Sequence, residues 1–294
     1  MRRSRAGRSA LAGAGLLLAA QLFATTALPQ PADYPDRKIT FVVGFAPGGG
    51  IDTFARVIAQ ELNRQFGWQF VVENRAGAAS NIAARAVATG APDGYTLLFT
   101  GNSYAINQTL YKNPGYATAD LVPVAFVATD SQALAVNADN PARTLSEFLT
   151  AGHTKPFSFG FGGSSARIAA EYVFHVLAKA DATAVPFQSG APSLNALLGH
   201  HVDVNVGPVA EVHPMIQQGT ARALAVTGPR RAAALPEVPT LEELGFAGIA
   251  INGWVGLLAP AKTPPEIVAK FNAAVARVLA DPEVDRRLRG LGYE

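Results

Sequence analysis

One stretch, residues 39–66, limits the fold more than any other, because an apolar run leads through three consecutive glycines into a helical pattern. Residues 39–45 are rich in β-branched and aromatic side chains, which is typical of a strand buried in a parallel sheet. Gly48, Gly49 and Gly50 break that pattern, and apolar residues then recur at helical spacing up to Phe66. The stretch predicts a strand, a glycine loop and a helix that begins at the loop.

The glycine loop suits a negatively charged ligand, because the first N–H groups of a helix lack intrahelical acceptors and the helix dipole is positive there. A phosphate-binding P-loop is excluded, since Ile51 and Asp52 stand where that motif has Lys followed by Ser or Thr. A dinucleotide-binding loop stays open, because the spacing is G-x-G-x-x-T and Glu73 ends the next predicted strand. A glycine turn that only connects strand and helix is the third interpretation.

Residues 1–27 have the composition of a secretory signal peptide, with four arginines, an apolar stretch at 11–23 and small residues at 25–27. An uncleaved membrane anchor is the alternative, although the apolar stretch is short for a membrane span. The sequence has no cysteine, which excludes disulfides, thiolate metal sites and a lipid-anchored cysteine. Loss of the four arginines turns the formal charge from +2 to −2. No basic cluster therefore predicts a nucleic acid or an anionic membrane as partner.

The rest of the first half repeats the same unit. Strands are expected at residues 69–73 and 95–100, and loops follow them at 74–81 and 100–103. Parallel strands place such loops at one edge of the sheet, beside the glycine loop at 46–52.

The second half builds the unit again. A strand at 157–161 leads through Gly162, Gly163, Ser164 and Ser165 into a helix at 166–180, whose Ile168, Tyr172, Val176 and Leu177 share one face. A strand at 124–136 leaves the first lobe and one at 249–258 returns to it, which predicts two crossovers and a hinge. Trp254 and Tyr104 are expected in the core or at the lobe interface, where either could form a wall of the pocket.

Several motifs together resemble the solute-binding proteins of tripartite tricarboxylate transporters, the Bug or TctC family. They are FAPGGGID, VVENRAGAASNIAA, APDGYTLLF, INQTLY, LLGHHVD and ARALAVTGPRRAAALPEVPTLEEL. The resemblance covers about residues 34–294. It implies an α/β, two-lobed periplasmic binding protein (type II-like), with a mostly parallel sheet flanked by helices in each lobe. The expected boundaries are 1–27 for the signal peptide, 34–128 and 255–294 for lobe one, and 129–254 for lobe two.

The resemblance implies capture of a small carboxylate in an interlobe cleft and its delivery to the permease subunits of the transporter. We expect a monomer in the periplasm, exported by a cleavable signal peptide, without cofactor, metal or catalytic residues. Gly162 to Ala166 lack the second glycine of a hydrolase G-x-S-x-G motif. A secreted enzyme or dinucleotide-binding protein on a doubly wound fold is the alternative.

The predicted ligand contacts lie in the loops at the starts of helices, where backbone N–H groups and hydroxyls can hold a carboxylate without a cation. They are Ala46, Pro47, Gly48, Gly49, Gly50, Asp52, Asn102, Ser103, Gly163, Ser164, Ser165, Phe187, Ser189 and Gly190. Asp52 has two interpretations: a residue that caps its loop, or, as the resemblance implies, one that faces the ligand. Two departures from the family pattern stand out: Phe187-Gln188-Ser189 replaces Tyr-Lys-Gly, and relatives continue beyond residue 294 with a strand and helix. The second departure leads us to expect an incomplete lobe one.

Overall fold

The computed structural model describes residues 34–246 and 251–293. The chain divides into two compact units, residues 1–36 and 37–294, and every element named below belongs to the second. The predicted signal peptide lies outside the described residues. None of the helices within these ranges combines the length and the hydropathy that a membrane crossing requires.

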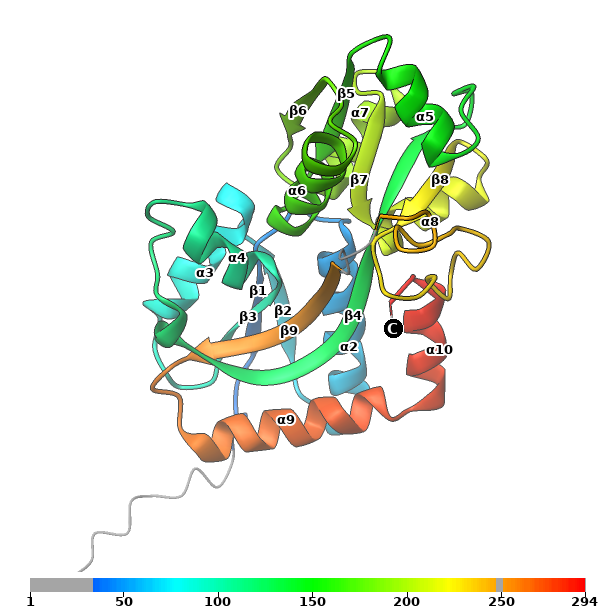
Figure 1. Ribbon diagram of the computed structural model, residues 1–294. Coiled ribbons are helices and arrows are strands. Elements are labelled where there is room, and N and C mark those ends of the chain that lie inside the picture. The colour runs from blue at the N-terminus through cyan, green and yellow to red at the C-terminus, as the bar shows by residue number, and fades with distance from the viewer. Residues whose placement is uncertain (1–33, 247–250, 294) are drawn as a thin grey trace, which may run out of the picture. The chain divides into compact units, whose positions relative to one another are not determined.

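The strands join in the order β2-β1-β3-β9-β4-β7-β5-β6, and β8 also pairs with β4 (Figure 1). The long strand β4 (Leu121–Asn137) lies within this order and pairs with strands on both sides of it. Up to Ser131 it pairs with β9 (Asn252–Pro260), and from Gln132 it pairs with β7 (Val204–Pro208) and β8 (Ala221–Val226). We call the part on the β9 side lobe one and the part on the β7 side lobe two.

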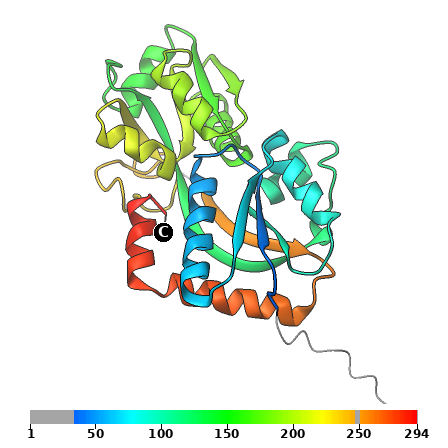
Figure 2. The ribbon, with the colours of Figure 1, turned by 180° about the vertical axis from the view of Figure 1, so that it is seen from behind.

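Lobe one contains a parallel group in which β1 (Ile39–Val43) lies between β2 (Phe70–Asn74) and β3 (Thr96–Gly101). β9 runs antiparallel to β3 and β4. The helices are α2 (Gly50–Phe66), α3 (Asn81–Ala88), α4 (Ser103–Leu110), α9 (Pro265–Leu279) and α10 (Pro282–Gly290). α9 packs against α2 and β4, as the view from behind shows (Figure 2). Buried phenylalanines, among them Phe41 and Phe271, join these helices to the sheet.

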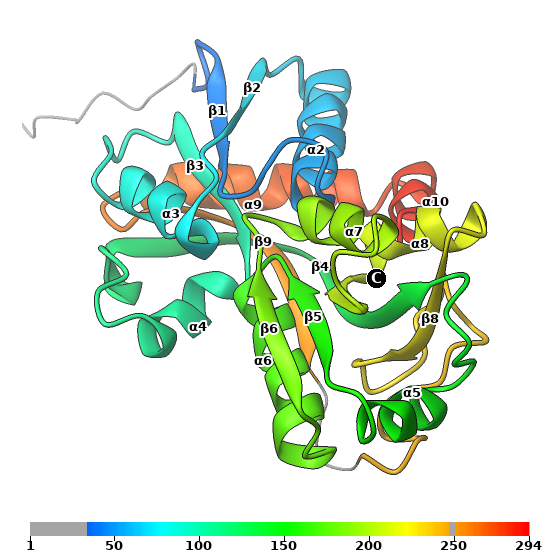
Figure 3. The ribbon, with the colours of Figure 1, turned by 90° about the horizontal axis from the view of Figure 1, so that it is seen from above.

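Lobe two has the same arrangement, with β5 (Phe157–Phe161) parallel to β6 (Ala182–Pro186) and β7 (Figure 3). Its helices are α5 (Leu145–Gly152), α6 (Ser164–Glu171), α7 (Gly190–Leu198) and α8 (Val209–Gln217). α2, α4, α6, α7 and α8 each follow the carboxyl end of a parallel strand. The chain order therefore brings the starts of helices from both lobes to the carboxyl edges of the parallel strands, where ligands bind in open α/β sheets.

The predicted α/β architecture, with parallel strands and helices on both sides of two crossing strands, is confirmed. The leaving strand expected at 124–136 is β4, and the returning strand expected at 249–258 is β9, although residues 249 and 250 are outside the described ranges. Both strands run antiparallel to their neighbours, so the parallel pairing is confined to the outer three strands of each lobe. The boundaries proposed at 128/129 and 254/255 stay a prediction. The pairing of β4 changes partner at Ser131 and Gln132.

The residues expected to share one face of the helix at 166–180 do not form its buried face. Ile168, Tyr172 and Val176 are exposed, whereas Val173 and Phe174 are buried. The helix widens into a π-helical segment at Tyr172–Leu177. A π turn takes in more residues than an α turn, so regular α-helical spacing fails over 172–177, whereas Ile168 is exposed although it lies in the regular part of α6.

Candidate ligand-binding site

The glycine loop between β1 and α2 is bonded to acceptors of the chain itself. Gly48 has a φ of +79°, and its N–H donates to Asp52 Oδ2 at 2.9 Å. The Gly49 N–H donates to a backbone carbonyl within the loop at 3.3 Å, and the Gly50 N–H donates to Glu211 Oε1 at 2.9 Å. The three amides predicted to hold a ligand carboxylate are thus occupied in this structure, and their role in ligand binding stays a prediction.

Asp52 holds this loop in place. Its side chain is 3% exposed, and it accepts hydrogen bonds from Gly48, from Arg56 at 2.9 Å and from Asn74 Nδ2 at 2.8 Å. Burial acts to raise the pKa of Asp52, but the hydrogen bonds from Arg56, Gly48 and Asn74 outweigh burial and bring the pKa below its usual value. These contacts support the interpretation that Asp52 caps the loop. A direct contact with ligand stays a prediction.

The start of α6 in lobe two is bonded to α4 in lobe one. The Ser164 N–H donates to Ser103 Oγ at 3.3 Å, and Ser164 Oγ donates to Asn107 Oδ1 at 2.5 Å. Asn102, next to Ser103, accepts from the Trp254 N–H at 2.7 Å. The following amides of α6, beginning with Ser165, have no acceptor within the helix, because an α-helix leaves its first four N–H groups unpaired.

Lobe two needs glycine where its loops meet. A Cβ on Gly162 would overlap the backbone of Ser189, and a Cβ on Gly190 would overlap the Glu211 carboxylate. The Ser189 side chain is 1% exposed, and its hydroxyl has no hydrogen-bond partner among the described residues. The first turn of α7 therefore lies directly against the loop before α6 and against Glu211.

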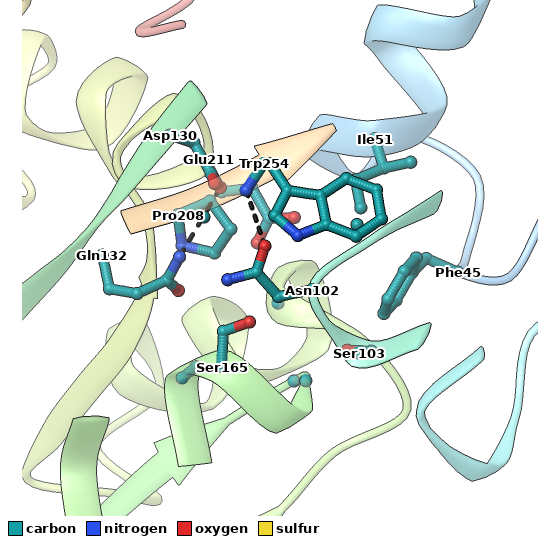
Figure 4. Close-up of a pocket in the computed structure, with 16 residues that line it drawn as sticks. Phe45, Ile51, Asn102, Ser103, Asp130, Gln132, Ser165, Pro208, Glu211 and Trp254 are labelled. Carbon is teal, nitrogen blue, oxygen red and sulfur yellow. Dashed lines mark hydrogen bonds between the residues drawn. The ribbon is translucent and has the colours of Figure 1, made fainter. Parts of the chain in front are cut away.

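A cavity of about 60 Å³ lies where these loops meet (Figure 4). Five of the predicted residues line it: Asn102, Ser103, Gly163, Ser165 and Gly190. The others lie outside its lining: Ala46, Pro47, Gly48, Gly49, Gly50, Asp52, Ser164, Phe187 and Ser189. Of these, Ser164 and Phe187 line a neighbouring cavity of about 290 Å³. Gly48 and Gly50 line another of about 260 Å³, beside Tyr293.

Two carboxyl groups face the cavity, from Asp130 on β4 and Glu211 on α8. Burial, and secondarily the Glu211 charge, raises the pKa of Asp130 to about 7. Burial also raises the pKa of Glu211, and the hydrogen bond from Gly50 counteracts part of this effect. Among the described residues that line the cavity there is no Lys, Arg or His. The positive potential here comes from helix N-termini, and the chain already places acids against it.

Sequence reasoning missed Asp130, Gln132 and Glu211 as parts of the site. The first two interrupt an otherwise apolar predicted strand, and Glu211 lies in the first turn of a helix that follows a buried strand. Both are signals of a polar site, but neither identifies its partners. Trp254, expected in the core or at the lobe interface, lines the cavity, whereas Tyr104 stacks on Tyr116 at 5.5 Å between ring centroids.

Two α/β lobes joined by crossing strands, with helix N-termini around a cavity that both lobes line, define a binding protein of the two-lobed periplasmic class. The chain belongs to the tripartite tricarboxylate transporter family receptors, TctC, which match it over residues 54–294. It is a solute-binding protein of that family and not an enzyme.

Solved relatives agree with this assignment over most of the chain. The periplasmic binding protein BugD is 30% identical with a TM-score of 0.84, and the match covers 89% of each chain. R. palustris Rpa4515, solved with adipate, is 32% identical with a TM-score of 0.86 and the same coverage. MatC (Rpa3494) from Rhodopseudomonas palustris, solved with bound malate, is 33% identical with a TM-score of 0.81, over 88% of this chain and 90% of that protein.

Proposed function

We propose that the protein captures a small organic acid in the cavity lined by Asn102, Ser103, Gly163, Ser165 and Gly190, and delivers it to a transporter permease. The observation that carries this proposal is the convergence of five helix starts, those of α2, α4, α6, α7 and α8, around that cavity. Helix N-termini offer N–H donors and positive potential, which suit a carboxylate. The relatives solved with adipate and malate support this class of ligand.

The start of α6 is the part of the site that we assign to the ligand carboxylate. Ser165 lines the cavity, and its amide is among those without an intrahelical acceptor. Micromolar affinity requires about 8 kcal/mol. Hydrogen bonds to a charged group contribute about 1.5–3 kcal/mol each, so four or five contacts, some through water, are sufficient. Closure of the lobes strengthens these contacts by excluding water.

Calorimetric titration of the purified, refolded protein with malate, adipate, succinate, citrate, aspartate and glutamate tests the proposal. We expect at least one acid to bind with micromolar affinity and without turnover. Gly163→Leu should abolish this binding. Its backbone is extended (φ −165°) and a Cβ meets only ordinary contacts at 3.7 Å, so the added side chain fills the cavity without straining the loop.

Gly290→Leu is the matched control, because a Cβ on Gly290 would have no neighbour within 4 Å. It should bind like the unchanged protein. If none of the acids binds to correctly folded protein, or if Gly163→Leu binds normally, the proposed site is wrong.

The proposal also covers the cellular location of the protein and its transport partner. We propose that residues 1–27 are cleaved on export, that the mature protein is a periplasmic monomer, and that the partner is a tripartite tricarboxylate permease. Mass spectrometry of protein from the periplasmic fraction tests the cleavage. Uptake of a labelled acid in cells with and without this chain tests delivery, and unchanged uptake would contradict it.

A further inference from the structure

The buried carboxyl groups of Asp130 and Glu211 at the cavity lack a full set of hydrogen-bond donors. Asp130 is 9% exposed, and the Gln132 Nε2 atom lies 3.5 Å from its Oδ2, which is long for a hydrogen bond. Glu211 Oε1 accepts from the Gly50 N–H, but Oε2 is buried without a hydrogen-bond partner among the described residues. A buried carboxylate oxygen without a donor is costly. Such an atom beside a cavity indicates a missing donor.

Tyr293 is another titratable group near the pair. Burial, and secondarily the charges of both acids, raises the pKa of its hydroxyl. It is not a cation, and the described lining of the cavity contains no cationic side chain. Burial raises the pKa values of both Asp130 and Glu211, and the charge of Glu211 adds to the rise at Asp130, as expected for carboxyl groups without a counter-charge. The described lining therefore supplies two acids at this place and no positive side chain to balance them when they ionise.

The donors and acceptors of the cavity lie at different places. Glu211 already occupies the amide of Gly50 at the start of α2, so the amides around Ser165 at the start of α6 remain for a ligand carboxylate. Figure 4 shows Asp130, Gln132 and Glu211 on one side of the cavity and Phe45 and Ile51 on the other. The site thus has an anion-binding part, a cation-binding part and an apolar wall.

A plain dicarboxylate does not match this arrangement. Its second carboxylate would meet Asp130 and Glu211, and once these acids are ionised, like charges at short range in a site of low dielectric repel strongly. A protonated nitrogen would instead donate charge-assisted hydrogen bonds to both acids.

We propose that the cavity selects an acid that also carries a protonated nitrogen, with its carboxylate at the start of α6 and its nitrogen between Asp130 and Glu211. The inference rests on the proposed function, because it assumes that this cavity holds the ligand. Beyond the proposed function, the inference states that the ligand also carries a positive charge and that Asp130 and Glu211 recognise it.

Matched pairs of acids that share a carbon skeleton test this inference by calorimetry: succinate with aspartate, glutarate with glutamate, and butyrate with 4-aminobutyrate. In at least one pair the aminated acid should bind at least about tenfold more tightly, about 1.4 kcal/mol. Asp130→Asn and Glu211→Gln should each remove most of that preference. The exposed acids Asp139 and Glu237 provide the controls Asp139→Asn and Glu237→Gln, which should leave it unchanged.

The pH dependence gives a second measurement that does not rely on the variants folding well. Affinity for the aminated acid should rise from about pH 5 to about pH 8, because Asp130 and Glu211 must ionise to bind a cation. If the unaminated acids bind equally or more tightly, or if affinity falls over that range, the inference is wrong while the proposed function stands. If no member of any pair binds, the inference is wrong, and if malate, adipate and citrate also fail to bind, the proposed function is wrong as well.

Discussion

The two strand–loop–helix units at β1–α2 and β5–α6 have similar sequences, but the loops before their helices contact different groups. In lobe one, the glycine loop before α2 is bonded to Asp52 and Glu211, so its amides are satisfied by the chain itself. In lobe two, the loop before α6 directs Gly163 and Ser165 toward the cavity. A helix N-terminus attracts anions, and the anion that takes it can belong to the protein.

The difference shows what the glycines do in each lobe. In the lobe-one loop, Gly48 provides a positive φ with open space around it. In lobe two, Gly162 allows the loop before α6 to lie close to the start of α7, because the backbone of Ser189 occupies the position that its Cβ would take. Substitution by alanine should therefore have unequal effects in the two loops.

Gly162→Ala should give the largest loss. The added methyl group overlaps backbone atoms at the start of α7, which cannot move as a flexible side chain would. We expect about 3 kcal/mol or more of lost stability, measured by urea unfolding. A loss below about 1 kcal/mol would show that the loops of lobe two are not in close contact.

The buried acid at the cavity should make the ligand-free protein less stable as the pH rises. The folded pKa of Asp130 is about 7 against an ordinary value of 3.8, so the folded state holds a proton that the unfolded state has lost. Stability from this group is complete below about pH 4 and is lost as the pH rises to about 7, by at most about 1.4 kcal/mol per pH unit. Urea unfolding at several pH values measures the slope. Asp130→Asn should flatten it, and an unchanged slope would argue against a buried acid here.

Asp52→Asn should test the capping of the lobe-one loop. The folded pKa of Asp52 is lowered, so its stabilisation is present above the ordinary pKa and is lost as the pH falls through the folded value. We expect a loss of about 1–2 kcal/mol at neutral pH, from weaker hydrogen bonds to Gly48 and Asn74. The Arg56 side chain is half exposed, so its share is small. The difference between the two proteins should shrink in acid, and normal ligand binding by the variant would rule out a direct role for Asp52.

Gly48→Ala should have the smallest effect. Alanine at a φ of +79° is strained, but a Cβ there has no neighbour within 4 Å. We expect a loss of about 1 kcal/mol in thermal or urea unfolding. A loss as large as that of Gly162→Ala would mean that the two glycine loops are under the same constraint.

Most of the fold could be predicted from the sequence because its cues are local. The strand at 157–161 is found at the predicted residues, and the helix that ends at Phe66 follows its apolar spacing closely. Local cues failed at Tyr172–Leu177, where a π-helical segment changed which side chains are buried. The loops that meet at the cavity also followed from parallel strand order, so Ser103, Ser165 and Gly190 were within reach of sequence reasoning.

The sequence by itself determined the repeated strand–loop–helix units, the two crossings and the family, because each depends on patterns of neighbouring residues. Only the tertiary structure decided which groups satisfy the helix starts. Glu211 bonds to Gly50 across 161 positions of sequence, and the approach of Glu211 to Asp130 depends on how the two lobes pack. Distances between residues so far apart depend on lobe closure and on the path of β4, which no local pattern encodes.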